Sequence, residues 1–296
     1  MTQSRRWILV AALLLVIVAW THQAHGEPKS APLNVATYNL RLDLKSDGSN
    51  AWPQRKAMVQ SLIRYHEFDI LGTQEGLPNQ IRDLEELTEF TRAGVGRDDG
   101  KSDGEHSAIF FRKARFTELD RGDFWLSESP DKPSKGWDAH CCNRLASWVR
   151  LRDRSSGEVL LVVSVHFDHE GVLARLESAK LLLRWIADNR RDDTVICLGD
   201  FNSTPDTAQI KAMRSAFRDA REVTLLPAYG PKETFNSFAI GRSPDPLIDY
   251  IFVDHNVRVL KYATLTDSNG VGYPSDHFPV VVRIEIDPNN RTGLRK

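Results

Sequence analysis

The chain has only three cysteines among its 296 residues and almost no net charge. Three cysteines are too few for a disulfide framework of the kind that holds small secreted domains together. The 39 lysines and arginines nearly balance the 40 aspartates and glutamates, so no overall basic charge attracts nucleic acid. This balance does not exclude a nuclease, because a bound divalent metal can supply positive charge locally.

The chain also lacks an internal repeat, a low-complexity segment and a linker rich in proline, glycine and serine. We therefore predict one α/β domain over residues 27–296, long enough to bury one large core. Cys141 and Cys142 are neighbours in a predicted loop over residues 131–143. We expect them to be free thiols, although an oxidising compartment would expose them to pairing. Cys197 lies within an apolar run and is expected to be buried.

The first 26 residues have the layout of a secretory signal peptide. Arg5 and Arg6 form a basic start, residues 7–20 are apolar, and Ala24-His-Gly26 is a small-x-small cleavage pattern. The apolar stretch is shorter than the roughly 20 residues that cross a bilayer. We therefore expect cleavage near Gly26 and a secreted or periplasmic protein, with a retained anchor as the alternative.

Apolar runs alternate with helical patterns along the rest of the chain. The predicted strands are residues 33–38, 68–73, 107–111, 115–124, 144–152, 159–165, 194–198, 248–253, 257–266 and 278–286. The predicted helices are residues 53–65, 77–89 and 171–189, and a fourth helix that Thr204 caps and Pro205 begins.

Polar clusters lie at the ends of these strands. They are Asn39-Leu-Arg41-Leu-Asp43, Gln74-Glu75, His166-Phe-Asp168-His169 and Gly199-Asp200-Phe-Asn202, which follow their strands, and Asp249 and Ser275-Asp276-His277, which begin theirs. All six can share one mouth only if the last two strands run opposite to the other four. This requirement predicts two mixed sheets packed face to face with helices outside, and it excludes a purely parallel sheet.

Several of these side chains suit a hard divalent cation. Mg²⁺ binds one or two carboxylates and completes its shell with water and substrate phosphate, and Glu75 and Asp276 can supply such carboxylates. Asn39 can offer its amide to metal or phosphate, with Arg41 or Asp43 at the rim. The local alternatives are a surface glutamate that opens a helix at Glu75 and a strand that runs into solvent after Asn39.

The other clusters suit proton transfer. A histidine such as His277 needs a carboxylate on its second ring nitrogen, and Asp249, inside an apolar strand, needs a partner. Asp200 is a candidate for activating water, and Asn202 for holding the nucleophile or a phosphoryl oxygen. His166 can donate to a phosphoryl oxygen as charge develops. The local alternatives are an Asx-turn after the strand that ends at Asp200 and a satisfied core histidine at His166.

As an ordered set, these motifs resemble the endonuclease/exonuclease/phosphatase (DNase I-like) family over about residues 33–286. The resemblance rests on Thr-Tyr-Asn39, Gln-Glu75, His166-Phe-Asp168, Gly-Asp200-Phe-Asn202, Ile-Asp249-Tyr and Ser-Asp276-His277. The stretches Gly96-Arg-Asp-Asp-Gly100, Gly104-Glu105 and Phe124-Trp-Leu-Ser resemble an exported bacterial branch of it. The family fold is a four-layered α/β/β/α sandwich of two mixed sheets with outer helices.

The resemblance also implies a mechanism, which is in-line attack of water on a phosphoester with Mg²⁺ or Mn²⁺ bound. The implied metal ligands are Glu75, Asn39 and Asp276. The implied catalytic residues are Asp200 as the base, His166, Asn202, and His277, which Asp249 orients. The implied substrate contacts are Arg144, Arg41 and Asp168.

We therefore expect an exported, metal-dependent phosphoesterase that acts as a monomer without a stable membrane anchor. The near-neutral charge favours a small, sugar- or lipid-linked phosphate over DNA, and a secreted DNase I-like nuclease is the alternative. A non-catalytic binding protein that keeps the fold is the alternative from another class, and the intact catalytic set argues against it. Asn202-Ser-Thr204 is a glycosylation acceptor pattern within the candidate site, which favours a bacterial envelope over a glycosylating pathway.

Overall fold

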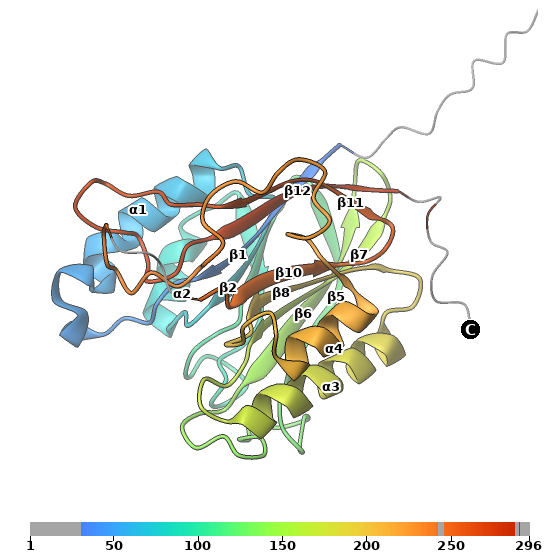
Figure 1. Cartoon of the computed structure of the whole chain (residues 1–296), viewed down its shortest axis with the longest axis horizontal. Coiled ribbons are helices and arrows are strands. Elements are labelled where there is room, and N and C mark those ends of the chain that lie inside the picture. The colour runs from blue at the N-terminus through green and yellow to red at the C-terminus, as the bar shows by residue number, and fades with distance from the viewer. Residues whose placement is uncertain (1–30, 242–245, 288–289, 291–296) are drawn as a thin grey trace, which may run out of the picture.

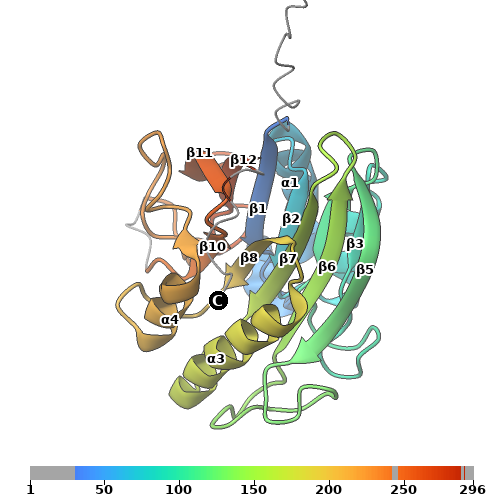
Figure 2. The same cartoon turned by 90° about the vertical axis from the view of Figure 1, so that its right-hand side faces the viewer.

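The computed structural model describes residues 31–241, 246–287 and 290. The predicted signal peptide, residues 1–26, lies outside the described residues. Within the described part, the strands form two six-stranded sheets, and helices cover the outer face of each sheet (Figures 1 and 2). None of the described helices combines the length and the apolar character that a bilayer crossing requires.

The elements occur in this order along the chain: β1 (Leu33–Asn39), the 3₁₀ segment η1 (Lys45–Asn50), α1 (Trp52–Tyr65), β2 (Ile70–Gln74), α2 (Pro78–Glu85), β3 (Phe90–Ala93), β4 (Ile109–Arg112), β5 (Phe116–Trp125), β6 (Leu145–Asp153), β7 (Val159–His166), α3 (Val172–Asn189), β8 (Thr194–Asp200), α4 (Ala208–Ala216), β9 (Arg218–Asp219), β10 (Asp249–Val253), β11 (Val257–Thr264) and β12 (Val280–Ile286).

The strand directions agree with the prediction from the polar clusters. The first sheet has the order β11-β12-β1-β2-β4-β3, and the second has the order β5-β6-β7-β8-β10-β9. β1 is parallel to β2 and β7 is parallel to β8. β12 is antiparallel to β1 and β10 is antiparallel to β8. The predicted fold, a four-layered sandwich of two mixed sheets, is confirmed.

Three apolar cores join the four layers. The central core lies between the sheets and includes Val35, Ile70, Val162 and Ile196. A second core packs α1 and α2 against the first sheet, and a third packs α3 and α4 against the second sheet. Because burying apolar area dominates folding free energy, these cores fix the separation and orientation of the sheets that carry the polar clusters.

Strand alternation determines where those polar side chains point, because successive residues face opposite sides of a sheet. On β1, Leu33 and Val35 lie in the central core, whereas Ala36 and Tyr38 lie under α1. Asn39 therefore continues the face between the sheets. The same alternation places His166 on β7, Asp200 on β8 and Asp249 on β10 on this inner face.

Two helix boundaries and three short elements differ from the sequence prediction. α2 ends at Glu85 because the following residues turn into β3, a strand that the sequence did not predict and that pairs with β4. α4 begins at Ala208 instead of directly after Thr204. Residues 204–207 form a turn in which the Thr207 N–H donates to the Thr204 carbonyl oxygen over 3.1 Å. η1 and β9 were also not predicted.

Gly72 of β2 marks a close approach of the two sheets. A Cβ atom at this position would lie 2.0 Å from Leu198 Cδ1 on β8 and 3.0 Å from Ser164 Oγ on β7. The absence of a side chain therefore lets the sheets approach directly beneath the polar clusters.

Gly72→Ala is expected to lower the free energy of unfolding by about 1–3 kcal/mol, because the added methyl group must displace Leu198 or widen the gap. Urea denaturation followed by circular dichroism measures this change. Gly272→Ala is the matched control, since the nearest atom to a Cβ there is Asn50 Oδ1 at 3.9 Å. Equal stability of the two variants would contradict the close packing at Gly72.

Candidate active site

The polar clusters meet at one edge of the central core, between the two sheets. Asn39 pairs in register with Gln74 on β2, and Asp200 lies between His166 on β7 and Asp249 on β10. The structure thus brings together residues that span most of the domain sequence. The edge at which β1, β2, β7 and β8 end and β10 begins is the candidate active site (Figure 1).

The Asn39 amide connects the two sheets at this edge. Its Nδ2 donates to Glu75 Oε1 over 2.9 Å and to Asp200 Oδ2 over 3.0 Å. The second oxygen of Glu75 accepts the Leu42 N–H over 3.0 Å. Asn39, Asp200 and the end of β2 are buried, so these hydrogen bonds are formed with little competition from water.

Three residues of the site have left-handed backbone conformations that are costly for residues other than glycine. The φ angles are 56° at Arg41, 62° at Glu75 and 45° at Asn202. Local hydrogen bonds hold two of them: the Arg41 N–H donates to Asn39 Oδ1 over 2.9 Å, and the Asn202 N–H donates to Asp200 Oδ1 over 2.8 Å. The backbone is therefore pre-organised around the carboxylates.

His277 and Asp249 form the predicted pair. His277 Nδ1 lies 2.9 Å from Asp249 Oδ2, which also accepts the Thr234 hydroxyl over 2.6 Å. The other ring nitrogen, Nε2, lies 3.9 Å from Asp200 Oδ2. Burial alone would lower the pKa of His277, but the charges of Asp249 and Asp200 more than offset this effect and raise the pKa to about 10.

Asp200 lies between two imidazoles. Its Oδ2 is 3.7 Å from His166 Nε2 and 3.9 Å from His277 Nε2. Burial and the neighbouring Asp249 charge raise the pKa of Asp200 to about 7. Burial, together with the Arg144 and Arg97 charges, lowers the pKa of His166 well below its usual value of about 6.5. The site therefore combines one charged imidazole with one neutral imidazole around a carboxyl group that titrates near neutral pH.

Arg97 and Glu105 also belong to this site and were not predicted from the sequence. Glu105 Oε2 accepts Arg97 Nη1 over 2.7 Å and lies 3.7 Å from His166 Nδ1. Burial raises the pKa of Glu105 to about 6, although the Arg97 charge opposes this shift. The pair belongs to a glycine-rich loop that folds back through a hydrogen bond from the Arg97 N–H to the Glu105 carbonyl oxygen. The sequence feature that could have predicted this pair is an arginine and a glutamate at the two ends of a glycine-rich loop.

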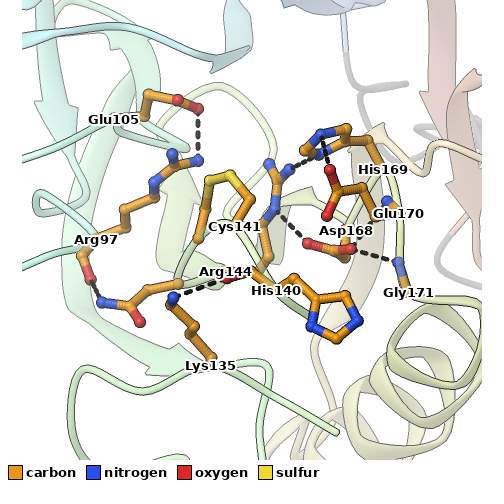
Figure 3. The surroundings of a disulfide bond; sticks show 12 residues. Arg97, Glu105, Lys135, His140, Cys141, Arg144, Asp168, His169, Glu170 and Gly171 are labelled. Atoms are coloured by element: carbon orange, nitrogen blue, oxygen red, sulfur yellow. Dashed lines mark hydrogen bonds and ion pairs between the residues drawn. A yellow bond between two sulfur atoms is a disulfide. The ribbon is translucent and has the colours of Figure 1, made fainter. Parts of the chain in front are cut away.

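Arg144 faces the same region from the start of β6, and its guanidinium is held by two neighbours. Its Nε donates to Asp168 Oδ2 over 3.4 Å, and its Nη2 lies 2.7 Å from His169 Nδ1 (Figure 3). The buried Nη1 has no hydrogen-bond partner in the described structure. A cavity of about 10 Å³, roughly one water molecule in size, is lined by Arg144, Arg97 and His166. The arginine can thus offer N–H groups to an anion.

Two predicted substrate contacts have partners within the protein. Asp168 is buried and accepts the Glu170 and Gly171 N–H groups at 2.9 and 2.6 Å in addition to Arg144. It therefore orients Arg144, and both of its oxygens are engaged within the protein. Arg41 donates to both carboxylate oxygens of Asp47, at 3.0 and 3.1 Å, and its Nε lies 3.8 Å from Asp276 Oδ2. This places Arg41 beside the predicted metal ligands.

Cys141 and Cys142 are joined by a disulfide bond, so the expectation of free thiols is wrong for this pair. The bond lies in the loop that precedes Arg144 (Figure 3). Cys197 is a free, buried thiol, as expected.

The donor set fits a divalent cation at two neighbouring places. Asp200, Asp249 and His277 have ligand atoms within 4.8 Å of one another, and the buried Asp249 Oδ1 has no hydrogen-bond partner in the described structure. The second place lies around Glu75 and Asp276, where burial and the Glu75 charge raise the pKa of Asp276, although His277 opposes this shift. Buried carboxylates that repel one another are stabilised by a bound cation, so the carboxylates at both places fit Mg²⁺ or Mn²⁺. His277, protonated and paired with Asp249, offers no free ring nitrogen to the metal.

Comparisons with known proteins agree with this geometry. The chain matches the profile of the Endonuclease/Exonuclease/phosphatase family over residues 36–277. A solved structure of a protein of this family from Bacteroides thetaiotaomicron is 39% identical, with a TM-score of 0.84, over 87% of this chain and 98% of that one. A mannosyl-6-phosphatase from the same organism is also 39% identical, with a TM-score of 0.81, over 85% of this chain and 99% of that one.

A more distant relative is Nocturnin of Drosophila melanogaster, which is 27% identical over 188 residues. These residues make up 51% of this chain and 29% of that protein, so the chain spans less than a third of this relative.

The His277–Asp249 pair predicts a distinctive titration in the metal-free protein. His277 is expected to stay protonated up to about pH 10, whereas His166 is expected to stay neutral above pH 6.5. Because the folded-state pKa of His277 lies above the unfolded value of about 6.5, its stabilising contribution is complete below that pH and is lost as the pH rises towards 10.

NMR of protein with ¹⁵N-labelled histidine measures both ring states directly. Asp249→Asn is expected to lower the pKa of His277 markedly, since burial then acts with less opposition. A wild-type His277 that titrates near its usual pKa would contradict the charge arrangement described above.

Proposed function

Because the chain belongs to the endonuclease/exonuclease/phosphatase family and is a phosphoesterase, we propose that it is a metal-dependent phosphatase for a small sugar phosphate. The observation that carries the proposal is the position of Asp200, between two imidazoles and in hydrogen-bond contact with Asn39. This arrangement suits water attack on a phosphoryl group, because a carboxyl group that can act as base lies beside two imidazoles and further carboxylates that can hold a cation.

The similarity to a mannosyl-6-phosphatase supports a sugar phosphate as substrate. The electrostatics support it as well. The chain has no overall basic charge. Arg97 and Arg144 supply local positive charge beside His166, partly offset by their partners Glu105 and Asp168. A compact phosphate dianion needs only such local charge, whereas a nucleic acid strand is normally held by a wider basic surface.

Glu75, Asn39 and Asp276 would hold the cation, with Asp200, Asp249 and His277 adjacent, and a bound cation would supply positive charge that polarises phosphoryl oxygens. Asp200 removes the proton from the attacking water, since its pKa of about 7 lies near neutral pH. Asn202 Nδ2 donates to the Phe167 carbonyl oxygen over 2.9 Å, which leaves its Oδ1 as an acceptor for that water.

The imidazoles and Arg144 act on the phosphoryl group. His277 carries a positive charge, and His166 is a neutral donor whose second nitrogen faces Glu105. Both can donate to phosphoryl oxygens as negative charge develops in the transition state. Arg144, held by Asp168, offers its unpartnered Nη1 to the same group.

A substrate panel with added Mg²⁺ or Mn²⁺ tests the proposal. We expect release of phosphate from mannose 6-phosphate and other hexose phosphates to exceed hydrolysis of bis-p-nitrophenyl phosphate, DNA and a phospholipid by about tenfold or more, as a site shaped for a monoester requires. Excess EDTA should abolish turnover and added Mg²⁺ or Mn²⁺ should restore it. Preferred cleavage of DNA would indicate a nuclease, and no turnover on any substrate would indicate a binding protein.

Asp200→Asn is expected to keep the fold and to reduce turnover by about 10³-fold or more, because it retains the shape of the side chain and removes its basicity. Phosphate release at saturating metal measures the loss, and circular dichroism verifies the fold. Asp206→Asn is the matched control, since Asp206 is an exposed aspartate in the following turn. Equal activity of Asp200→Asn and wild type would show that another group is the base.

A further inference from the structure

Arg55 of α1 carries a buried charge that neither the sequence motifs nor the proposed chemistry uses. The residue is 2% exposed, and burial lowers the pKa of its guanidinium. Within residues 31–241 and 246–287, no carboxylate forms an ion pair with it; its nitrogens donate to backbone carbonyl groups instead. A buried cation without an ion pair is costly unless its donors are satisfied. The carbonyl contacts therefore stabilise the buried charge of Arg55.

The carbonyl groups that accept from Nη1 and Nη2 belong to the two segments that carry predicted metal ligands. Nη1 donates to the Leu40 carbonyl oxygen and, over 3.1 Å, to that of Pro274. Nη2 donates to the Arg41 carbonyl oxygen over 2.6 Å. Leu40 and Arg41 directly follow Asn39, and Pro274 lies two residues before Asp276. The guanidinium therefore bridges the loop after β1 and the segment before β12.

A second contact joins the same two segments closer to the ligands. The Ser275 hydroxyl donates to the Asn39 carbonyl oxygen over 2.7 Å. The Asp276 carbonyl oxygen, in turn, accepts the Asn236 N–H over 2.7 Å and the Ser237 N–H over 3.1 Å. Asp276 is thus held on one side by the turn around Asn236 and, through Pro274, on the other side by Arg55.

Aromatic rings fix the position of the guanidinium itself. The Arg55 Cζ atom lies 5.1 Å from the ring centroid of Trp52 and 5.6 Å from that of Phe238. A third anchor comes from Nε, which donates to the Asn50 carbonyl oxygen over 2.7 Å. A planar guanidinium can serve carbonyl groups in several directions and stack on rings at once, which a lysine ammonium cannot do.

We infer that Arg55 is a positioning residue for the divalent-cation site: it sets the distance between Asn39 and Asp276 by holding the backbone of both segments. The inference rests on the proposed metal dependence and adds a residue that touches neither metal nor substrate. Mutation of a residue that orients metal ligands typically costs roughly 10- to 100-fold in metal affinity or activity. Arg55 therefore controls metal affinity more than the acid–base step, because Asp200 is carried by β8 of the second sheet and His277 is held by Asp249.

Arg55→Lys isolates this role, because lysine retains the positive charge and loses the fork of donors. We expect the dissociation constant for Mn²⁺, measured by the EPR signal of the free ion, to rise about tenfold or more. Phosphate release should return close to the wild-type rate at saturating Mn²⁺, so that the variant changes the metal requirement more than the maximal rate. Arg64→Lys is the matched control on the same helix, where Arg64 forms an exposed ion pair with Glu89.

Circular dichroism and melting of the metal-free proteins verify folding. Unchanged Mn²⁺ affinity in folded Arg55→Lys would overturn the inference. If Arg55→Lys does not fold, Phe238→Leu is tested in its place. This change removes one aromatic ring that stacks on the guanidinium and is expected to weaken Mn²⁺ binding about threefold. Unchanged binding in Phe238→Leu would overturn the inference. A wild-type protein that binds no Mn²⁺ would instead overturn the proposed metal dependence, which separates the two failures.

Discussion

The two hydrogen bonds donated by the Asn39 amide are the constraint on which the rest of the site depends. They join Glu75 of the first sheet to Asp200 of the second, at the edge where the apolar packing between the sheets ends. A neutral amide can approach two carboxylates without the repulsion that a third acid would add. The central core, which sets the distance between the two sheets, therefore also sets the distance between the functional groups that they carry.

The charges are distributed unevenly about this amide. Carboxylates gather beside the predicted cation ligands, whereas His166 is flanked by Glu105, Arg97 and Arg144. His277 is charged because Asp249 lies against it, and His166 is neutral because it is buried among cations. Two residues of the same type thus acquire different protonation states from their surroundings, and the catalytic roles assigned to them follow from that difference.

Much of this arrangement could be predicted from the sequence, because strand periodicity is a local property. It placed Asn39, His166, Asp200 and Asp249 at strand ends, and the requirement for a shared mouth gave the strand directions, which the structure and the family membership confirm. The assignment of catalytic and metal-binding roles to these residues stays a prediction, as does the signal peptide.

The remaining features depend on contacts that no local pattern encodes. Glu105 reaches His166 from a glycine-rich loop about which periodicity says nothing. Asp168 lies in a recognisable motif, yet its use in orienting Arg144 depends on a strand start 24 residues away. The buried contacts of Arg55 join α1 to a segment 219 residues later in the chain. Such long-range polar contacts become visible only when the layers are assembled.

The pairing of β1 with β12 also determines when, during folding, the first sheet can be completed. Leu33 pairs with Ile284 in the first sheet. The hydrogen bonds of β1 are therefore complete only when β12, near the end of the domain, has joined it. Loops of this length are slow to close. Asp276 and His277 lie shortly before β12, so the candidate active site is complete only when β12 has joined the sheet. A nascent chain on the ribosome consequently lacks these two residues of the candidate active site until almost the whole domain has emerged.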